Sequence, residues 1–524
     1  MAATGRTPGA ITVAELVGML SLSADLGLGQ PEEHLARSCL IAARLADHMG
    51  LSAADRETTY YLALLAWVGC TADSHETASR FGDDITLRAG VYDVEIGSPA
   101  MLGYLLRRAG SGAGVQRRAR VAGELLATAG RTVRESLVSH CQVTGQLADR
   151  LGFDTRLSDC LTQTFARWDG RGTPAGVRGE AIGIPTRLVQ LADLVEVHHR
   201  RGGLPAALDV VRRRSGTTLD PAVVEAFCCW GEQVLDSLPS ETSWAALIDA
   251  DPAPRTLSGA ALDAGLEAIA DFVDLKSPYF AGHSRGVADL AAAAARYAGL
   301  PADDVDLVRR AGLVHDLGRS GVPNTIWDKP GKLTDVERER VELHAYYTDR
   351  MLRRLPALRD VAAIATMANE RLDGSGYHRA LPAAAIPANA RLLAAADCYH
   401  AMIEPRPHRP AHPPRDAAGQ LRAEARAGRL DPSAVEAVLA AAGHHTRRTP
   451  GGPAGLTPRE VEVLVLLARA ASTRQIAHAL GIAPKTAGNH IERIYTKIGT
   501  NTRAAAALFA MQHGLLRTLD PVDP

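Results

Sequence analysis

The chain has 524 residues, which is too long for a single hydrophobic core and fits about three domains. It is 46% apolar with a formal net charge of −1, which is typical of a soluble globular protein and excludes a disordered chain. Its seven cysteines are irregularly spaced without a CxxC pair, which excludes a disulfide scaffold and a zinc finger. The sequence begins without a signal-peptide pattern, and no apolar run reaches about 18 residues, so we expect a cytoplasmic protein without a membrane span.

Two regions repeat the same separations between residues. The separations are 32 residues for His34–Ala66 and His283–His315, and 53 residues for His140–Asp193 and His344–Asp397. The surrounding sequences agree as well, with RWDGRGTPAGVRGEAIGIPTRLVQLAD in one region and RLDGSGYHRALPAAAIPANARLLAAAD in the other. These coincidences predict two tandem copies of one domain.

The first copy, residues 1–236, differs from the second in two ways. It carries an insertion of 45 residues between Ala66 and His140. It also has Ala66-Trp67 where the second copy has His315-Asp316, and a Trp cannot bind a metal as an Asp can. We therefore expect a degenerate domain that serves as a structural relic or a sensor surface, followed by a linker at 237–259.

The second copy, residues 260–442, has the periodicity of helices. The segment TDVERERVELHAYYTDRMLRRL opens with Thr334 and Glu337, which form a capping box at a helix start. No segment alternates in the manner of strands, so both copies are predicted to be all-α bundles. A Gly- and Pro-rich stretch at 443–455 predicts a second linker.

The His315-Asp316 dipeptide ends an apolar helical run and precedes a turn at Gly318. About one such dipeptide is expected by chance in a chain of this composition, and a core His beside a capping Asp is the simpler interpretation. The position at a helix end would nevertheless allow the adjacent imidazole and carboxylate to bind one ion, with further ligands from other helices.

The second copy resembles the HD-GYP subgroup of HD-domain metal-dependent phosphohydrolases. The matching segments are HSRGVA at 283, HDLGR at 315, His344, RLDGSGY at 371, AADCYHAM at 395, RPHR at 406 and GRLDPSAVEAV at 428. The resemblance implies that His283, His315, Asp316 and Asp397 bind a metal and that His344 belongs to a second metal position. It also implies activity on cyclic dinucleotides, the usual substrates of the family.

Several positions depart from the pattern of that family. The Gly-rich turn of the family is present. Its residues Asp373, Gly374, Gly376 and Tyr377 could shape a pocket or hold a phosphate. The two family histidines that precede Glu370 and bind metal are replaced by Ala368 and Asn369. His378 and His400 also stand in place of other residues, and spacing leaves open whether either binds metal or is solvated. We therefore expect one divalent ion, Mn or Fe, rather than two.

A single divalent ion could still support hydrolysis, because it lowers the pKa of a bound water toward ~7. Asp316 and Arg319 are the predicted catalytic residues, with Arg319 offering a positive charge to a phosphate where the family usually has Lys. The sequence leaves open whether this site hydrolyses a phosphoester or only binds a ligand.

The C-terminal region is predicted to be a separate domain at 456–519, and its net charge differs from that of the rest of the chain. Residues 456–517 carry eight Lys and Arg against three Glu, so they have a net charge of +5 and the rest of the chain has −6, which indicates an anionic partner. Thr457 and Glu460 form a capping box, a second helix is expected from about Thr473 to Leu480, and a third begins at Pro484. The order of these residues resembles a LuxR-type helix-turn-helix, which implies binding of double-stranded DNA. The predicted DNA-contacting residues are Thr473, Lys485, Thr486, Asn489, His490, Arg493 and Lys497.

Two functions fit these patterns. One is a DNA-binding transcriptional regulator whose HD-type domains bind a metal or a phosphoester ligand and thereby control the DNA-binding domain. The other is a metal-dependent phosphohydrolase with an attached DNA-binding module. In either case the resemblance to LuxR-type proteins implies a homodimer formed through about residues 503–513.

Overall fold

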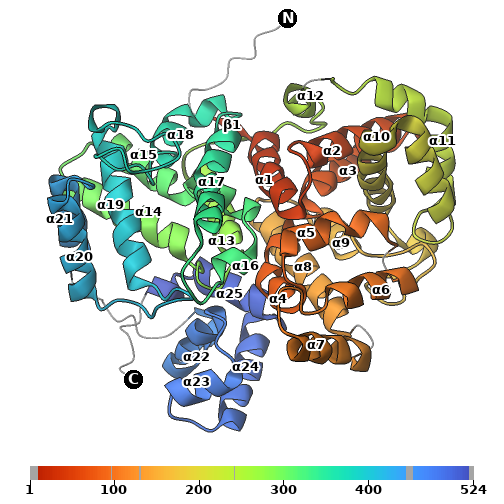
Figure 1. Ribbon diagram of the computed structural model, residues 1–524. Coiled ribbons are helices and arrows are strands. Elements are labelled where there is room, and N and C mark those ends of the chain that lie inside the picture. Colours follow the sequence, from red (N-terminus) through yellow and green to blue (C-terminus); the bar gives the residue numbers. More distant parts are fainter. Residues whose placement is uncertain (1–9, 96, 129–130, 241, 444–452, 518–524) are drawn as a thin grey trace, which may run out of the picture. The chain divides into compact units, whose positions relative to one another are not determined.

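The computed structural model describes residues 10–95, 97–128, 131–240, 242–443 and 453–517. These residues are mainly helical, and their named strands form one antiparallel pair in which Ile11 lies opposite Leu257. The predicted all-α fold is therefore confirmed. The chain divides into two compact units, Met1–Gly265 and Leu266–Pro524 (Figure 1).

The first unit is a helical bundle with an additional group of short helices. Its elements are β1 (Ile11–Thr12), α1 (Val13–Leu28), α2 (His34–His48), α3 (Ala53–Leu65), η1 (Val68–Thr71), α4 (Ser74–Phe81), α5 (Asp84–Ala89), η2 (Val91–Asp93), α6 (Pro99–Arg108), α7 (Val115–Ala127), α8 (Arg131–Arg150), α9 (Thr155–Thr162), η3 (Gly179–Ala181), α10 (Ile184–Arg214), α11 (Pro221–Asp236), α12 (Trp244–Asp249) and β2 (Thr256–Leu257). The predicted insertion corresponds to the helices α4 to α7, which share a small core of their own around Phe81, Tyr104 and Leu125.

The second unit continues from α13, which crosses the boundary between the units. Its bundle comprises α13 (Gly259–Asp274), α14 (His283–Tyr297), α15 (Ala302–Val314), η4 (Leu317–Gly321), α16 (Asn324–Trp327), α17 (Asp335–Leu352), η5 (Pro356–Leu358), α18 (Arg359–Ala365), η6 (Ala383–Ala385), α19 (Ala388–Ile403), α20 (Pro414–Arg426) and α21 (Pro432–Ala441). The predicted capping box at Thr334 and Glu337 is present and begins α17.

The centre of this bundle is formed by α14, which packs on α15, α19 and α21. Helices α14 and α15 approach closely because Gly312 has no side chain, and a methyl group built there would lie 2.6 Å from the Cα of Ala288. The close approach brings the start of α14 and the end of α15 into one buried region, and these helix ends carry His283 and His315.

Several helices of the two units have matching lengths. The pairs are α1 and α13 with 16 residues each, α2 and α14 with 15, and α3 and α15 with 13. The segment 237–259, expected to be a linker, contains α12 and β2, and β2 pairs with β1 in the first unit. The segment therefore contains a short helix and a strand and is more than a simple linker. Of the second expected linker, 443–455, residues 444–452 lie outside the described residues.

The C-terminal helices are η7 (Pro453–Gly455), α22 (Pro458–Ala468), α23 (Thr473–Ala479), α24 (Pro484–Ile498), α25 (Arg503–Gln512) and η8 (Leu515–Arg517). The helix starts predicted at Pro458, Thr473 and Pro484 agree with the structure. Ala487 and Ile494 are buried on the inner face of α24.

None of the helices in the described ranges has the length and hydropathy needed to cross a membrane. All seven cysteines are free thiols.

Replacing Gly312 by Ala tests the contact between α14 and α15. The added methyl group would push the two helices apart, so we expect Gly312→Ala to lower the free energy of unfolding by about 1–3 kcal/mol. Gly419→Ala in α20 is the matched control, because no atom lies within 4 Å of its built Cβ and the helix propensity of Ala should add up to about 1 kcal/mol. Urea denaturation followed by circular dichroism measures both changes; equal effects of the two variants would contradict the packing argument.

Candidate metal centre

The start of α14 places His283 between two buried carboxylates. Its side chain is fully buried, and its Nε2 lies 3.2 Å from Asp397 Oδ1 and 3.6 Å from Asp316 Oδ2. Asp397 comes from α19, whereas Asp316 follows the end of α15. Three segments far apart in the sequence therefore meet at one point.

Two further histidines face the same carboxylates. His315 Nε2 lies 2.8 Å from Asp316 Oδ2 and 3.7 Å from Asp397 Oδ1. His344, from α17, places its Nε2 3.2 Å from Asp316 Oδ1. All five residues predicted to bind metal are therefore gathered in one buried cluster.

The opposite ring nitrogen of each histidine has its own acceptor. The Nδ1 of His315 is 2.8 Å from the carbonyl oxygen of Gly312, and that of His344 contacts the carbonyl oxygen of Val341. The Nδ1 of His283 lies 2.8 Å from Glu404 Oε2. Because each Nδ1–H donates to an acceptor, each Nε2 is left to face the carboxylates, which is the arrangement of metal-binding histidines.

The central atoms of the cluster fit a divalent cation. His283 Nε2, His315 Nε2 and Asp316 Oδ2 are all buried, and the two ring nitrogens lie 3.6 and 2.8 Å from Asp316 Oδ2. Ligand atoms of His283, His315 and Asp397 all lie within 4.8 Å of one another. Imidazole nitrogens mixed with carboxylate oxygens suit Mn, Fe or Zn better than Ca or Mg.

Arg319 also belongs to the cluster. Its guanidinium contacts Asp316 Oδ2 and lies 4.0 Å from the ring centroid of Phe280. Burial alone would raise the pKa of Asp316, but Arg319 and His315 hold it well below its ordinary value. Arg319 therefore keeps Asp316 ionised and is directed at this carboxylate, although we predicted that it would face a phosphate.

The Gly-rich turn brings one of its four residues to the site. Tyr377 donates its hydroxyl hydrogen to Asn369 Oδ1 at 3.0 Å, and its ring lies 5.9 Å from that of His344. Asp373 is exposed and accepts hydrogen bonds from Ser375 in its own turn. Gly374 has φ +78°, and a Cβ at Gly376 would lie 2.4 Å from the nitrogen of Arg371, so both glycines are required by the shape of the turn.

The two positions that depart from the family pattern have different surroundings. Ala368 is fully buried. Asn369 Nδ2 lies 3.4 Å from His344 Nε2. Asn369 therefore links His344 to Tyr377 by its amide, where the family has an imidazole.

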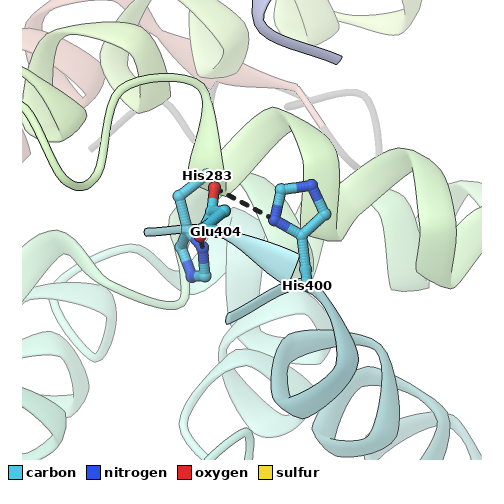
Figure 2. A group of neighbouring side chains, drawn as sticks. All are labelled: His283, His400 and Glu404. Atoms are coloured by element: carbon cyan, nitrogen blue, oxygen red, sulfur yellow. Dashed lines mark hydrogen bonds and ion pairs between the residues drawn. The ribbon is translucent and has the colours of Figure 1, made fainter. Parts of the chain in front are cut away.

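His378 and His400 have different surroundings. His378 Nε2 lies 3.3 Å from Asp349 Oδ2 and so pairs with a residue outside the cluster. His400 Nδ1 lies 3.2 Å from Glu404 Oε1, and His283, His400 and Glu404 form a second group that could hold an ion (Figure 2).

Sequence reasoning missed two acidic residues of the site. One is Glu404, and the other is Asp274, which accepts hydrogen bonds from the backbone nitrogen and the hydroxyl of Ser284. Burial raises the pKa of Asp274 to about 6. The sequence signal for such a buried acidic residue is a carboxylate within an otherwise apolar segment, such as Glu404 in HAMIEP.

The predicted DNA-contacting residues lie on α23 and α24. Lys485, Thr486, Asn489 and Arg493 are exposed, whereas Thr473 and His490 are half-buried. The exposed group forms one polar and basic face of α24.

Lys497 contacts a neighbouring helix: its Nζ lies 2.7 Å from Glu460 Oε2 and 3.0 Å from the carbonyl oxygen of Gly455. Its ammonium pairs with Glu460 at the start of α22, and a DNA contact by Lys497 stays a prediction.

Comparison with known families agrees with both sites. Residues 267–434 match the HD domain family, and residues 454–510 match the bacterial regulatory proteins of the luxR family. The chain contains an HD domain followed by a LuxR-type domain.

Curated relatives of the HD domain are phosphodiesterases. The chain is 29% identical over 406 residues to 3'3'-cGAMP-specific phosphodiesterase 3 of Vibrio cholerae, which covers 76% of this chain and 88% of that protein. It is 36% identical over 160 residues to a cyclic di-GMP phosphodiesterase of Thermotoga maritima, covering 30% of this chain and 43% of that protein.

A solved structure extends the similarity beyond the HD domain. The crystal structure of a cyclic GMP-AMP specific phosphodiesterase of V. cholerae matches 83% of this chain and 99% of its own, with a TM-score of 0.59 and 26% identity. The match is longer than the second unit, so it includes part of the first unit.

The first unit has a different buried cluster. His34 at the start of α2 places Nε2 3.0 Å from Asp193 Oδ1 and Nδ1 2.6 Å from Glu196 Oε2. The hydroxyl of Tyr92, from the inserted segment, lies 3.2 Å from Asp193 Oδ1. Neither group that could hold an ion in the described part of the chain lies in this unit.

The charge on His34 makes the stability of the first unit dependent on pH. Burial alone would lower the pKa of His34, but Asp193 and Glu196 raise it from 6.5 to about 10. The native His34 therefore retains a proton that the unfolded chain releases above its ordinary pKa. The stabilisation is complete below about pH 6.5 and is lost as the pH rises through about 10, at up to ~1.4 kcal/mol per pH unit.

Urea denaturation between pH 6.5 and 10, followed by tryptophan fluorescence, measures this slope. Four of the five tryptophans lie in the first unit, so the signal reports mainly on that unit. His34→Gln is the control and should remove the slope while lowering stability at pH 7. A wild-type slope that persists in His34→Gln would show that other groups cause it.

Proposed function

We propose that the protein is a metal-dependent phosphodiesterase of 3'3'-linked cyclic dinucleotides joined to a DNA-binding module. The observation that carries this proposal is the convergence of three imidazole Nε2 atoms on Asp316 and Asp397. Each of these histidines is oriented by an acceptor at its other nitrogen, as a preorganised metal site requires. The site residues lie at the ends of α14 and α15 and in the middles of α17 and α19, so these helices fix the geometry.

The relatives support catalysis more strongly than sensing. The sequence patterns alone fit both a ligand-sensing regulator and a phosphohydrolase. The protein covered to 88% by this chain is named a 3'3'-cGAMP-specific phosphodiesterase, and the shorter matches include cyclic di-GMP phosphodiesterases. These names favour the enzymatic interpretation and a substrate with two phosphodiester bonds.

The residues of this cluster would have separate roles in binding the ion and in keeping Asp316 ionised. His283, His315 and Asp397 would hold the ion, with Asp316 beside them. When bound, a divalent ion supplies Lewis-acid activation of water and of a phosphoryl oxygen. Arg319 keeps Asp316 ionised, and burial of the cluster excludes bulk water, which strengthens each electrostatic contact.

The DNA-binding proposal depends on the exposed face of α24. Lys485 and Arg493 offer positive charge to phosphates, and Thr486 and Asn489 lie between them near the start of the helix. Short polar side chains at this position suit base edges in a major groove, with the cations on the DNA backbone. Dimerisation through residues 503–513 remains part of this proposal.

We further propose that the first unit is a degenerate copy of the HD domain. The equal lengths of α1 and α13, α2 and α14, and α3 and α15 support this domain organisation. His34 and Asp193 keep the places of His283 and Asp397, whereas the His-Asp pair is absent. Such a unit would contribute structure or regulation without an ion of its own.

Asp316→Asn tests the catalytic proposal. The wild type should contain about one equivalent of Mn or Fe and hydrolyse 3'3'-cGAMP or cyclic di-GMP, whereas the variant should lose the ion and the activity because a central carboxylate is gone. Elemental analysis and chromatography of the reaction products measure both properties. His478→Ala, an exposed histidine on α23, is the control and should retain both. An Asp316→Asn variant with full diesterase activity would exclude hydrolysis at this site.

Arg493→Ala tests the DNA-binding proposal. The loss of one phosphate contact should weaken binding of the full chain to DNA and reduce the slope of log K against log salt by about 1. Arg422→Ala removes the same charge from an exposed position on α20 and serves as the matched control. Band shifts at several salt concentrations measure the slope, and equal slopes for the wild type and both variants would argue against this face.

A further inference from the structure

Glu404 lies directly behind the histidine that begins α14. The chain leaves α19 at Ile403, and the next residue, Glu404, is 7% exposed. Its Oε2 accepts the Nδ1–H of His283 at 2.8 Å and a hydrogen bond from Arg406 Nη2 at 3.0 Å. Figure 2 shows this carboxylate beside the rings of His283 and His400.

The position of the Glu404 carboxylate is fixed from several directions. Arg406 is itself anchored, because its Nη1 donates to the carbonyl oxygen of Tyr279 at 2.6 Å. Arg409 donates to the backbone oxygen of Glu404 at 3.0 Å. His400 packs against α14 where Gly286 leaves room, since a methyl group there would lie 1.9 Å from His400 Nε2. Glu404 therefore cannot turn away from His283 without disrupting these contacts.

The first unit also has a histidine at a helix start whose Nδ1 faces a carboxylate paired with an arginine. His34 Nδ1 lies 2.6 Å from Glu196 Oε2, and Arg200 donates to the same carboxylate at 3.2 Å. Glu196 comes three residues after Asp193, whereas Glu404 comes seven residues after Asp397. A carboxylate backed by an arginine thus faces the Nδ1 of the helix-starting histidine in both units, although its place in the sequence has changed.

The contacts of Glu404 also distinguish between two roles. His283, His400 and Glu404 could by their distances hold a cation themselves. However, the Arg406 guanidinium already occupies Oε2, and a cation there would have to share that oxygen with a positive charge. His283 would also need an unprotonated Nδ1, whereas its Nε2 is the ring nitrogen that faces Asp316 and Asp397. These contacts favour a role for Glu404 through His283.

We propose that Glu404 is a positioning residue that accepts the Nδ1–H of His283 and thereby directs the Nε2 lone pair toward Asp316 and Asp397. The proposal rests on the metal site described above. His315 and His344 use backbone carbonyl oxygens for the same purpose, whereas His283 uses a carboxylate, which is a stronger acceptor and makes the imidazole a more basic ligand. Glu404 therefore makes His283 the strongest imidazole ligand of the site.

Titration of the metal-free full-length protein with Mn2+, with free Mn2+ measured by electron paramagnetic resonance, tests this role. We expect Glu404→Ala to weaken binding by about 10–100-fold. Glu404→Gln retains an acceptor oxygen of the same reach and should weaken binding less than Glu404→Ala. His400→Ala should have little effect, and all variants should bind the same number of ions as the wild type. Thermal melts identify any variant that fails to fold.

Two results would overturn the proposal. One is unchanged Mn2+ affinity in a folded Glu404→Ala protein. The other is the loss of one of two bound ions in both Glu404→Gln and His400→Ala, because that pattern would make Glu404 a ligand of a second cation.

A second measurement does not require metal binding. Proton NMR of the metal-free protein should show two strongly downfield imidazole resonances, from His283 bonded to Glu404 and from His34 bonded to Glu196. Glu404→Ala should remove only the first, and His34→Gln only the second. If the wild type binds no Mn2+, the proposed metal-dependent function fails, and the resonance alone decides the role of Glu404. A spectrum unchanged by Glu404→Ala would overturn that role.

Discussion

The burial of Asp316 and Asp397 in the centre of a helical bundle is the constraint on which the site depends. An isolated ionised carboxylate in such surroundings is strongly unfavourable, so each must be paired with positive charge or a cation. The chain supplies three imidazole rings and Arg319, and no single helix could carry them all. The bundle has to bring the ends of α14 and α15 and the middles of α17 and α19 together, and the close contact at Gly312 makes this possible.

The first unit meets a similar constraint without a site for an ion. Asp193 and Glu196 are both buried, and a single charged His34 lies between them, with Arg200 and Tyr92 completing the contacts. Under the proposed duplication, Ala66 and Trp67 take the place of the His-Asp pair and add no charge to be compensated. The inserted segment contributes Tyr92, so the insertion is part of the buried network and is more than a surface addition.

The sequence predicted features that depend on neighbouring residues, such as helix starts. It could not predict side-chain contacts between residues far apart in the chain. Helix starts at Thr334, Thr457 and Pro484 follow from capping within a few residues. The resemblance to HD-GYP proteins, rather than any local pattern, implied that His283, His315, His344 and Asp397 are neighbours. Glu404 was missed because its partner is 121 residues away, and the contact of Lys497 with Glu460 was missed because the two lie 37 residues apart. Helix α12 was taken for a linker, since its short sequence is flanked by prolines and polar residues and is buried only by packing within its unit.

The distribution of ligands around Asp316 argues for one ion rather than two. His283, His315 and Asp397 converge on the side of Oδ2, whereas the side of Oδ1 has only His344. Ala368 has no ligand atom, and the amide of Asn369 lies 3.4 Å from His344 Nε2. A second transition-metal ion on the Oδ1 side would therefore have one imidazole and one shared carboxylate, which is too few protein ligands for a stable site. The catalysis proposed above would therefore depend on an ion held by His283, His315 and Asp397, and hence on the residues that orient the His283 ring.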